Sequence, residues 1–448
     1  MQHYLTTVLP GLTLLLFIIN IFYKGNTVQS CLLFVLTLLP LMDIKVTYEA
    51  YGGFKTFDII CFYCFIFLFK DFITINLESR NNFYFVLFVL FSIIILLGGL
   101  ASEFPGKTYL SLLKTLPVFI FARFLMTECF KDESFFPRVI KALKTSYVIA
   151  LVFMAIQVVV GLKFTFYPGL SPNTIDPVFH IIRYPGVFYD SQAHGQYLAM
   201  GSFLFLYVEK GSARKIYALN YLVFVLAVVA ISLAGSRSAF GGFIAGLLLV
   251  FLMTAKQYRI YGIILMVGGF ILLKAFSFHS GVFDRAENLS EDLLFRQQLW
   301  KEAFDISKKH PYLGIGANNY QNYVIRHSQD QYLEVEDGQL VYFDQPENGY
   351  LKIMVELGFI GFAIFALYLI VPLVRGASYA IKGIYDNRVA FFMAALVSWM
   401  VAFNTVYSIY DYRLLIMVAT LIVLMVAYPL KEEIIEEDDL YELEEQEV

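Results

Sequence analysis

Residues 83–100, FYFVLFVLFSIIILLGGL, decide the fold class because they form eighteen consecutive positions without a charge. An α-helix needs about 20 mostly apolar residues to cross the hydrocarbon core of a bilayer. Comparable apolar runs recur along the chain, and the clear ones centre on residues 5–23, 109–126, 146–162, 195–208, 218–234, 240–254, 260–276, 351–374, 389–404 and 414–429. Two weaker candidates lie at residues 31–42 and 59–69. The sequence predicts an all-α, polytopic membrane helical bundle of about 12 to 13 spans.

The composition excludes several classes of protein. Of the 448 residues, 59% are hydrophobic and 16% are charged, and the mean hydropathy is +0.66. Soluble domains are about 25% charged, so a water-soluble enzyme, a disordered chain, a disulfide-stapled module and a nucleic-acid binder are excluded. Cys61 and Cys64 have the spacing of a redox or zinc pair. Without a second pair or a nearby His, we expect them to pack as small apolar residues.

The chain divides into a membrane domain and a short tail. We expect residues 1–430 to form one integral membrane domain, with residues 5–23 as its first span rather than a cleavable signal. Residues 431–448 hold ten acidic residues and one lysine. Such a segment repels itself and buries little apolar surface, so we expect a disordered cytoplasmic tail.

Basic residues in short loops mark the cytoplasmic side of a membrane protein. They cluster at residues 131–144, 210–215, 256–259 and 375–388. This assignment places residues 163–193, the turn at 235–238 and the loop at 278–347 on the outer face, and thirteen spans would place the N-terminus there as well.

The outer loop at residues 278–347 exceeds the length at which loops without a function are common. Apolar residues recur with helical spacing at 293–304, after a candidate N-cap at Ser290. We expect this loop to carry short amphipathic helices across the outer face. The first should end near His310 and Pro311, where proline cannot continue a helix.

Three arginines share the outer side. Arg237 lies in a turn between two apolar runs, where a charge is costly and usually faces a bundle interior or an aqueous cavity. Its guanidinium suits bidentate phosphate binding, and the alternative is an arginine that snorkels to the interface. Arg296 is either a ligand-binding group or a solvated residue paired with Asp292. Arg183 is either a ligand-binding group or an interfacial anchor.

Glu347 lies where the outer loop re-enters the membrane. A carboxylate beside apolar surface can act as a general base, and the plainer alternative is a cap for the following helix. His180 and His194 stand alone, without a second ligand at metal spacing. We therefore expect no metal and no cofactor, and the missing Asp-x-Asp pair disfavours a metal-dependent, sugar-nucleotide glycosyltransferase.

Several motifs occur in one order between residues 180 and 375: RYPGVFYD at 183–190, AGSRS at 234–238, Arg296-x-x-x-Trp300, Pro311-x-x-Gly314-x-Gly316, and Glu347-Asn-Gly-Tyr-Leu followed by Glu356-Leu-Gly-x-x-Gly361. This order resembles the O-antigen ligase and O-antigen polymerase superfamily of bacterial envelope enzymes. The resemblance implies a multi-pass glycosyltransferase of the bacterial plasma (inner) membrane that works without a metal at the outer face. Its donor would be a glycan on undecaprenyl pyrophosphate, and its acceptor another glycan or a lipid core.

The resemblance also assigns roles to residues. Arg237 and Arg296 would bind the donor pyrophosphate, and Glu347 would activate the acceptor hydroxyl, so these three are the expected catalytic residues. Two fixed positive charges in a low-dielectric site would stabilise the leaving pyrophosphate. The expected substrate-binding residues are Arg183, Asn348, Trp300 and Tyr350.

Glu347 departs from the ligases, which carry His-Asn at this place, whereas polymerases and capsule or exopolysaccharide homologues more often carry an acidic residue. This difference favours polymerisation of lipid-linked repeat units of O-antigen, capsule or exopolysaccharide. A ligase that moves the glycan to a lipid core or to protein Ser/Thr is the first alternative. A transporter or flippase is the second alternative. The long outer loop and the lack of an evident internal repeat argue against it. Besides donor, acceptor and bilayer, a chain-length regulator is a candidate partner.

Overall fold

The computed structural model describes residues 2–25, 27–46, 53–68, 79–167, 169–171, 174–175, 181–209, 211–254, 289–327, 332–334, 340–342 and 345–430, with 260, 263–264 and 267. Most of the expected span at residues 260–276 lies outside these ranges. His180 and the acidic tail at residues 431–448 also lie outside them.

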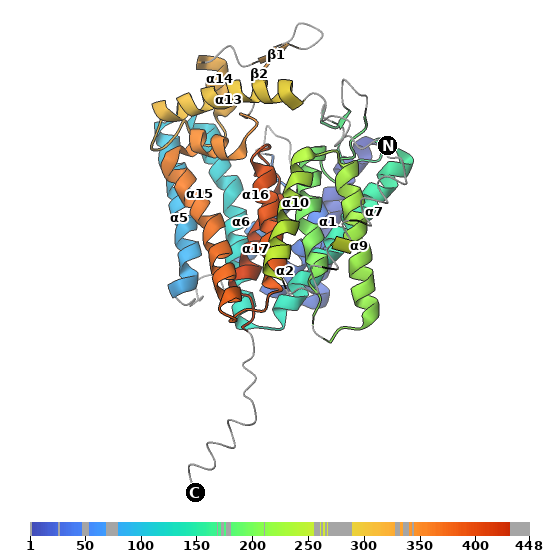
Figure 1. Ribbon diagram of the computed structural model, residues 1–448. Helices are drawn as coiled ribbons and strands as arrows, with labels where there is room; N and C mark the ends of the chain where they lie inside the picture. Colours follow the sequence, from blue (N-terminus) through green and yellow to red (C-terminus); the bar gives the residue numbers. More distant parts are fainter. Residues whose placement is uncertain are drawn as a thin grey trace.

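Mostly apolar helices stand side by side in a bundle with the more polar α8 (Figure 1). Their bounds are α1 (Gln2–Lys24), α2 (Val28–Thr37), α3 (Thr56–Phe67), α5 (Ser79–Ala101), α6 (Pro105–Lys131), α7 (Phe135–Val160), α8 (Ser191–Ser202), α9 (Arg214–Leu233), α10 (Arg237–Met253), α15 (Gly349–Ile381), α16 (Val389–Phe403) and α17 (Tyr412–Val426). Two 3-10 turns, η1 (Leu39–Leu41) and η4 (Phe203–Leu206), follow α2 and α8.

The helices differ in length. Among the described residues, α5, α6, α7, α9 and α15 are long and apolar enough to cross a membrane, and six shorter apolar helices of 10–17 residues stand with them. A helix of 15 residues spans about 22 Å, less than the hydrocarbon core. The non-helical backbone at the ends of these short helices must therefore be shielded from lipid by neighbouring helices. The predicted class of an all-α membrane bundle is confirmed, although its spans are less uniform than the sequence indicates.

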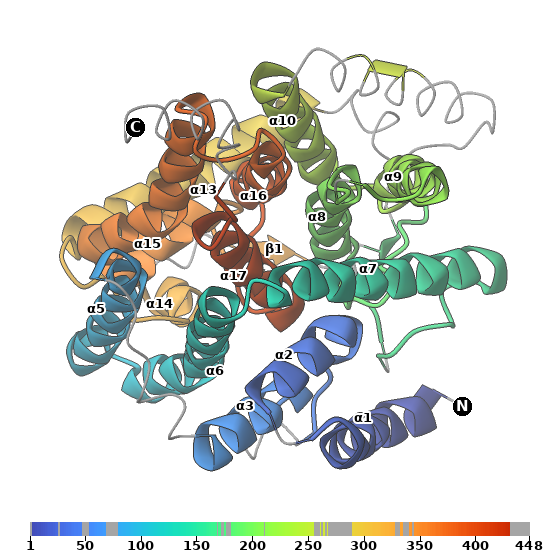
Figure 2. The same ribbon diagram turned by 90° about the horizontal axis from the view of Figure 1, so that it is seen from below.

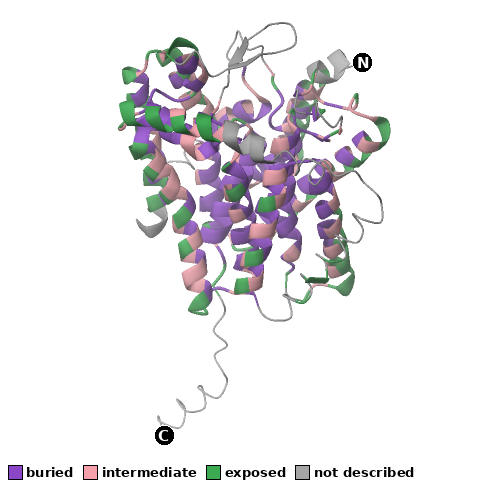
Figure 3. Cartoon of the chain, turned by 45° about the horizontal axis from the view of Figure 1, so that its top comes forward, coloured by how far each residue is buried: buried purple, intermediate pink, exposed green. Residues whose placement is uncertain are grey.

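Helix α8 lies in the interior of the bundle. Its sequence, SQAHGQYLAMGS, is more polar than that of a lipid-facing span, and residues 194–205 are all buried. Figure 3 shows buried residues concentrated in the middle of the bundle, with exposed residues on its outward faces. The expected span at residues 195–208 is thus a core element enclosed by its neighbours.

Helices α10 and α16 pack closely because glycines face their contact. A Cβ on Gly242 would lie 2.1 Å from the carbonyl oxygen of Ser398, and one on Gly246 would lie 2.8 Å from that of Ala394. Moving forward along α10 means moving backward along α16, so the two helices are antiparallel. The first turn of α10 therefore lies beside the end of α16.

The outer loop lies across one end of the bundle. It contains α13 (Leu289–Lys309), α14 (Tyr320–His327) and the antiparallel strands β1 (Tyr332–Glu334) and β2 (Leu340–Tyr342). Figure 1 shows α13 lying over the helix ends, and Figure 2 shows it behind α10, α15 and α16. The expected amphipathic helix is confirmed, although it begins one residue before Ser290. The two short strands depart from the all-α expectation. They pair with each other because the backbone N–H and C=O groups of an extended segment need hydrogen-bond partners.

Three of the four basic loops gather at the end opposite α13, and the fourth, at residues 256–259, lies outside the described residues. The α6–α7 turn, the beginning of α9 and the α15–α16 turn all lie there, while α1 begins near the α13 end (Figure 1). This arrangement matches the alternation inferred from the basic clusters. The positive-inside rule therefore predicts that the α13 end is the outer one.

Candidate functional site

Arg296 and Glu347 meet at the end of the bundle that α13 covers. Nη2 of Arg296 lies 3.7 Å from Oε2 of Glu347, and the two side chains are 25% and 24% exposed. Arg296 lies on α13, and Glu347 lies just before α15. The structure therefore joins two of the three expected catalytic residues in one ion pair that solvent can reach.

Asn348, rather than Glu347, caps α15. Its Oδ1 accepts hydrogen bonds from the N–H groups of Tyr350 and Leu351 at 3.0 and 3.1 Å. Its Nδ2 donates to Oδ1 of Asn404 at 3.1 Å. Glu347 itself adopts φ +48°, a left-handed conformation that is uncommon outside glycine and persists only where the surroundings enforce it.

Arg237 is the first residue of α10 and is half-buried. Ser236 caps this helix, because its Oγ accepts from the N–H of Ala239 at 3.3 Å. The positive end of the helix dipole and a guanidinium coincide here, which favours an anion as partner. Since α10 begins beside the end of α16, and Asn404 after α16 contacts Asn348, Arg237 belongs to the same end of the bundle as Arg296 and Glu347.

Arg183 packs against the turn that precedes α10. It is 3% exposed, and a Cβ on Gly235 would lie 2.8 Å from its Cγ. The N–H of Arg183 donates to the carbonyl oxygen of Thr174 at 2.8 Å, and that of Tyr184 donates to Leu233 at 3.2 Å. Arg183 is thus a buried neighbour of the Arg237 turn rather than an exposed interfacial anchor.

Trp300 and Tyr350 also lie at this end. Trp300 is one turn after Arg296 on α13, and its Nε1 is shielded from solvent without a hydrogen bond. The hydroxyl of Tyr350 donates to the carbonyl oxygen of Met400 at 2.8 Å, and its ring centroid lies 5.1 Å from that of Phe403. Substrate binding by these two residues, Asn348 and Arg183 stays a prediction.

Sequence reasoning missed Arg413, which is 1% exposed. Its Nε donates to Oδ1 of Asp411 at 2.9 Å and its Nη2 to the hydroxyl of Tyr167 at 3.0 Å. It also donates to the carbonyl oxygen of Val187, and its guanidinium lies 3.8 Å from the ring centroid of Phe188. Arg413 therefore holds the 183–190 segment in place from the side of α17.

Asp43 and Lys55 extend this network. Nζ of Lys55 lies 2.5 Å from Oδ1 of Asp43, which accepts the N–H of Tyr412 at 2.8 Å. Burial, followed by the nearby Asp411 carboxylate, raises the pKa of Asp43, against the opposite effect of Lys55 and Arg413. The sequence signal was Asp-Tyr-Arg directly before the last apolar run.

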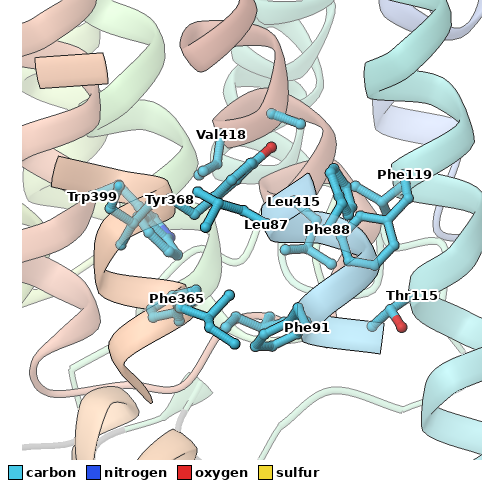
Figure 4. Close-up of a pocket in the computed structure, with 15 residues that line it drawn as sticks. Leu87, Phe88, Phe91, Thr115, Phe119, Phe365, Tyr368, Trp399, Leu415 and Val418 are labelled. Atoms are coloured by element: carbon cyan, nitrogen blue, oxygen red, sulfur yellow. The ribbon is translucent and has the colours of Figure 1, made fainter. Parts of the chain in front are cut away.

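An apolar cavity of about 80 Å³ lies between α5, α6, α15, α16 and α17 (Figure 4). Its lining includes Phe88, Phe91, Phe119, Phe365, Tyr368 and Trp399, and none of the expected site residues. Trp399 stacks on Phe403 at 4.7 Å between centroids, and Phe403 contacts Tyr350. One aromatic layer therefore separates this cavity from the Glu347–Asn348 segment.

A groove on α3, α5 and α6 shares Phe88 and Phe119 with the cavity. Its remaining lining is almost wholly apolar, with Ser92 as the exception. The rings of Phe88 and Phe119 thus lie between the interior cavity and this apolar groove. In the described part of the chain, no three His, Cys, Asp or Glu side chains lie close enough together to hold a metal ion.

Similarity to known proteins falls on the segment that carries the ion pair. Residues 222–366 match the O-antigen ligase family model. The match covers about a third of the chain and runs from α9 into α15, so it contains Arg237, Arg296 and Glu347 but not Arg183. It confirms the resemblance to the O-antigen ligase and polymerase superfamily. No curated protein matches the chain.

The match to the O-antigen ligase family model and the five long apolar helices among the described residues together indicate a multi-pass membrane protein. Family members are ligases and polymerases of the glycosyltransferase kind, so the match supports enzymatic glycosyl transfer.

Proposed function

We propose that this protein polymerises lipid-linked polysaccharide repeat units of O-antigen, capsule or exopolysaccharide at the outer face of the bacterial inner membrane. The donor in this proposal is a glycan on undecaprenyl pyrophosphate. The observation that carries it is the Arg296–Glu347 pair at the covered end of the bundle, within the segment that matches the family.

The reaction joins an acceptor sugar to the donor sugar. The acceptor hydroxyl oxygen attacks the anomeric carbon, and the bond from that carbon to the pyrophosphate oxygen breaks. Glu347 takes the hydroxyl proton, while Arg237 and Arg296 stabilise the negative charge that grows on the pyrophosphate. The 3.7 Å separation of Arg296 and Glu347 is longer than a hydrogen bond, so an entering phosphate can replace the carboxylate beside the guanidinium.

The apolar cavity supports a lipid-linked donor. A prenyl chain gains free energy by leaving water for apolar surface, and the cavity is lined by aromatic and aliphatic side chains (Figure 4). The groove on α3, α5 and α6 would admit such a chain from the bilayer past Phe88 and Phe119. The pyrophosphate would then lie beyond the Phe403 layer, near Arg237 and Arg296.

The test is a reaction in vesicles that contain the purified full-length protein and an undecaprenyl-pyrophosphate-linked repeat unit. A polymerase forms a ladder of products that remain on the lipid carrier, without any other acceptor. The absence of a ladder under conditions where the donor is bound would overturn the proposal.

A ligase is the second candidate, because the matched family model is described by that activity. A ligase forms product only when a lipid core or a Ser/Thr peptide is added. The same vesicles, supplied with either acceptor, therefore distinguish the two functions.

A further inference from the structure

Two of the motif segments meet at a kink in α15. Gly358 has φ +69° and interrupts the helix. The carbonyl oxygens of Val355 and Glu356, which a regular helix would use internally, instead accept the N–H groups of Ile315 and Gly316, both at 3.0 Å. We call residues 311–320 with residues 355–359 the junction.

The junction depends on close backbone approach. A Cβ on Gly358 would lie 2.3 Å from the carbonyl oxygen of Tyr312, and one on Gly314 would lie 2.5 Å from that of Glu356. Both glycines have positive φ, a backbone conformation that is strained for a residue with a side chain. The spacing of these glycines in the sequence therefore reflects a docking surface between the loop and α15.

Glu356 crosses the junction with its side chain. Its Oε2 accepts the N–H of Asn318 at 2.9 Å, and its Oε1 accepts that of Tyr320 at 3.2 Å. Glu356 is 2% exposed, and Nζ of Lys352 lies 3.9 Å from Oε1. A buried carboxylate is costly unless charges and donors compensate it, and here the compensation comes from backbone groups of the outer loop.

The end of α13 is built onto this junction. Ala303 and Ile306 of α13 share a hydrophobic cluster with Ile315, Val324 and Val355, separate from the main core. Helix α13 ends at Lys309, two residues before the junction begins. The anchored end of α13 is therefore its C-terminal end, and Arg296 lies toward the other end.

We propose that Glu356 is a positioning residue that holds Arg296 opposite Glu347. The 13 residues from Arg296 to Lys309 span about 20 Å at 1.5 Å per residue. A tilt of about 5° at the junction would move Arg296 by nearly 2 Å over that length, which is enough to lose the 3.7 Å pair. The inference rests on the proposed function, in which Arg296 binds the donor pyrophosphate.

The first test measures the position of α13 without substrate. Spin labels at Gln297→Cys on α13 and Tyr189→Cys on the 183–190 segment, both exposed positions, report the distance across the site in the full-length protein. The four native cysteines are buried. Glu356→Gln keeps the size of the side chain but removes its charge, and we expect a shifted or broadened distance distribution.

The matched control is Glu103→Gln. Glu103 also links the bundle to the outer loop, through an ion pair with Arg326 and a hydrogen bond with His327 of α14, but it is exposed and lies outside the junction. The control should keep the original distance distribution. An unchanged distribution in Glu356→Gln overturns the inference.

The second test measures transfer. We expect Glu356→Gln to lower kcat/KM for the donor by about tenfold to a hundredfold, the usual loss from misplacing a catalytic group by an ångström or more. Because Glu356 acts through Arg296, the variant should cause little further loss in an Arg296→Ala background. Multiplied losses in the double variant overturn the inference.

If Glu356→Gln does not accumulate in membranes, Glu356→Asp replaces it, since Asp keeps the charge beside Lys352 but is one methylene shorter. An inactive wild-type protein whose α13 still moves in the variant would overturn the proposed function and leave the positioning role supported. An active variant with an unmoved α13 would overturn the positioning role alone.

Discussion

The two halves of the candidate site are held in different ways. The bundle half consists of Arg183 and Arg237 and rests on close helix packing: a Cβ on Gly195 of α8 would lie 2.7 Å from Ser236, and Gly242 of α10 nearly touches α16. The loop half consists of Arg296 and Glu347. It rests on α13, which the hydrogen bonds and the small hydrophobic cluster of the junction attach to the bundle.

This difference indicates where the site can move. Tightly packed interiors resist displacement because every shift opens a void or forces an overlap. An element held by few buried contacts opens at lower free energy and often gates substrate access. We therefore expect the bundle half to stay fixed while α13 adjusts when the glycan and its lipid enter.

The largest expected effect is that of Glu347→Gln in the loop half. Removing a general base lowers the transfer rate on the order of 10² to 10⁴-fold, whereas the unchanged shape preserves donor binding. Initial rates of ladder formation and binding of a labelled donor check both statements. Glu302→Gln, elsewhere on α13, is the control, and full polymer output from Glu347→Gln at normal expression would refute the role.

Arg237→Lys probes the bundle half. Lysine retains the charge but not the planar fork that contacts two phosphate oxygens, so we expect kcat/KM for the donor to fall by about a hundredfold at most, with an unchanged thermal midpoint. Arg214→Lys, exposed at the opposite end of the bundle, should leave transfer unaffected. Equal activity of the two variants would contradict a phosphate-binding role for Arg237.

Gly242→Ala tests whether close packing holds the bundle half. Its Cβ would overlap the Ser398 carbonyl oxygen at 2.1 Å, and overpacking of this kind costs about 1–3 kcal/mol. The thermal midpoint in detergent should fall. Gly241→Ala is the matched control because its Cβ meets nothing within 4 Å, and equal midpoints for the two variants would show that the packing is not limiting.

Gly314→Ala in the junction should lower stability less than Gly242→Ala does. Gly314 has φ +67°, and an added Cβ would lie 2.5 Å from the carbonyl oxygen of Glu356. The substitution should therefore displace α13, and transfer should fall by several-fold to about tenfold. The midpoint should change less than in Gly242→Ala, because the junction lies outside the main core. Gly106→Ala, with open space around its Cβ, is the control. A larger midpoint loss in Gly314→Ala would reverse the comparison.

Local patterns predicted much of the loop half. The apolar spacing at residues 293–304 located α13, and His310-Pro311 marked its end. Both signals are visible in the sequence because a helix brings residues three or four positions apart onto one face. The same reasoning expected residues 195–208 to form a membrane span. Hydropathy alone cannot distinguish a span from α8, a helix that other helices enclose.

The sequence by itself determined that the chain is a helical membrane protein, which loops are basic, and that an amphipathic helix forms near residues 293–304. These properties depend on residues that are neighbours along the chain. Only the tertiary structure decided that Arg296 faces Glu347, that Asn348 takes the helix cap, and that Arg413 supports the 183–190 segment. Each of these contacts depends on how the helices pack and on where α15 bends. The free energy of that packing comes from residues far apart along the chain, so no local sequence pattern specifies it.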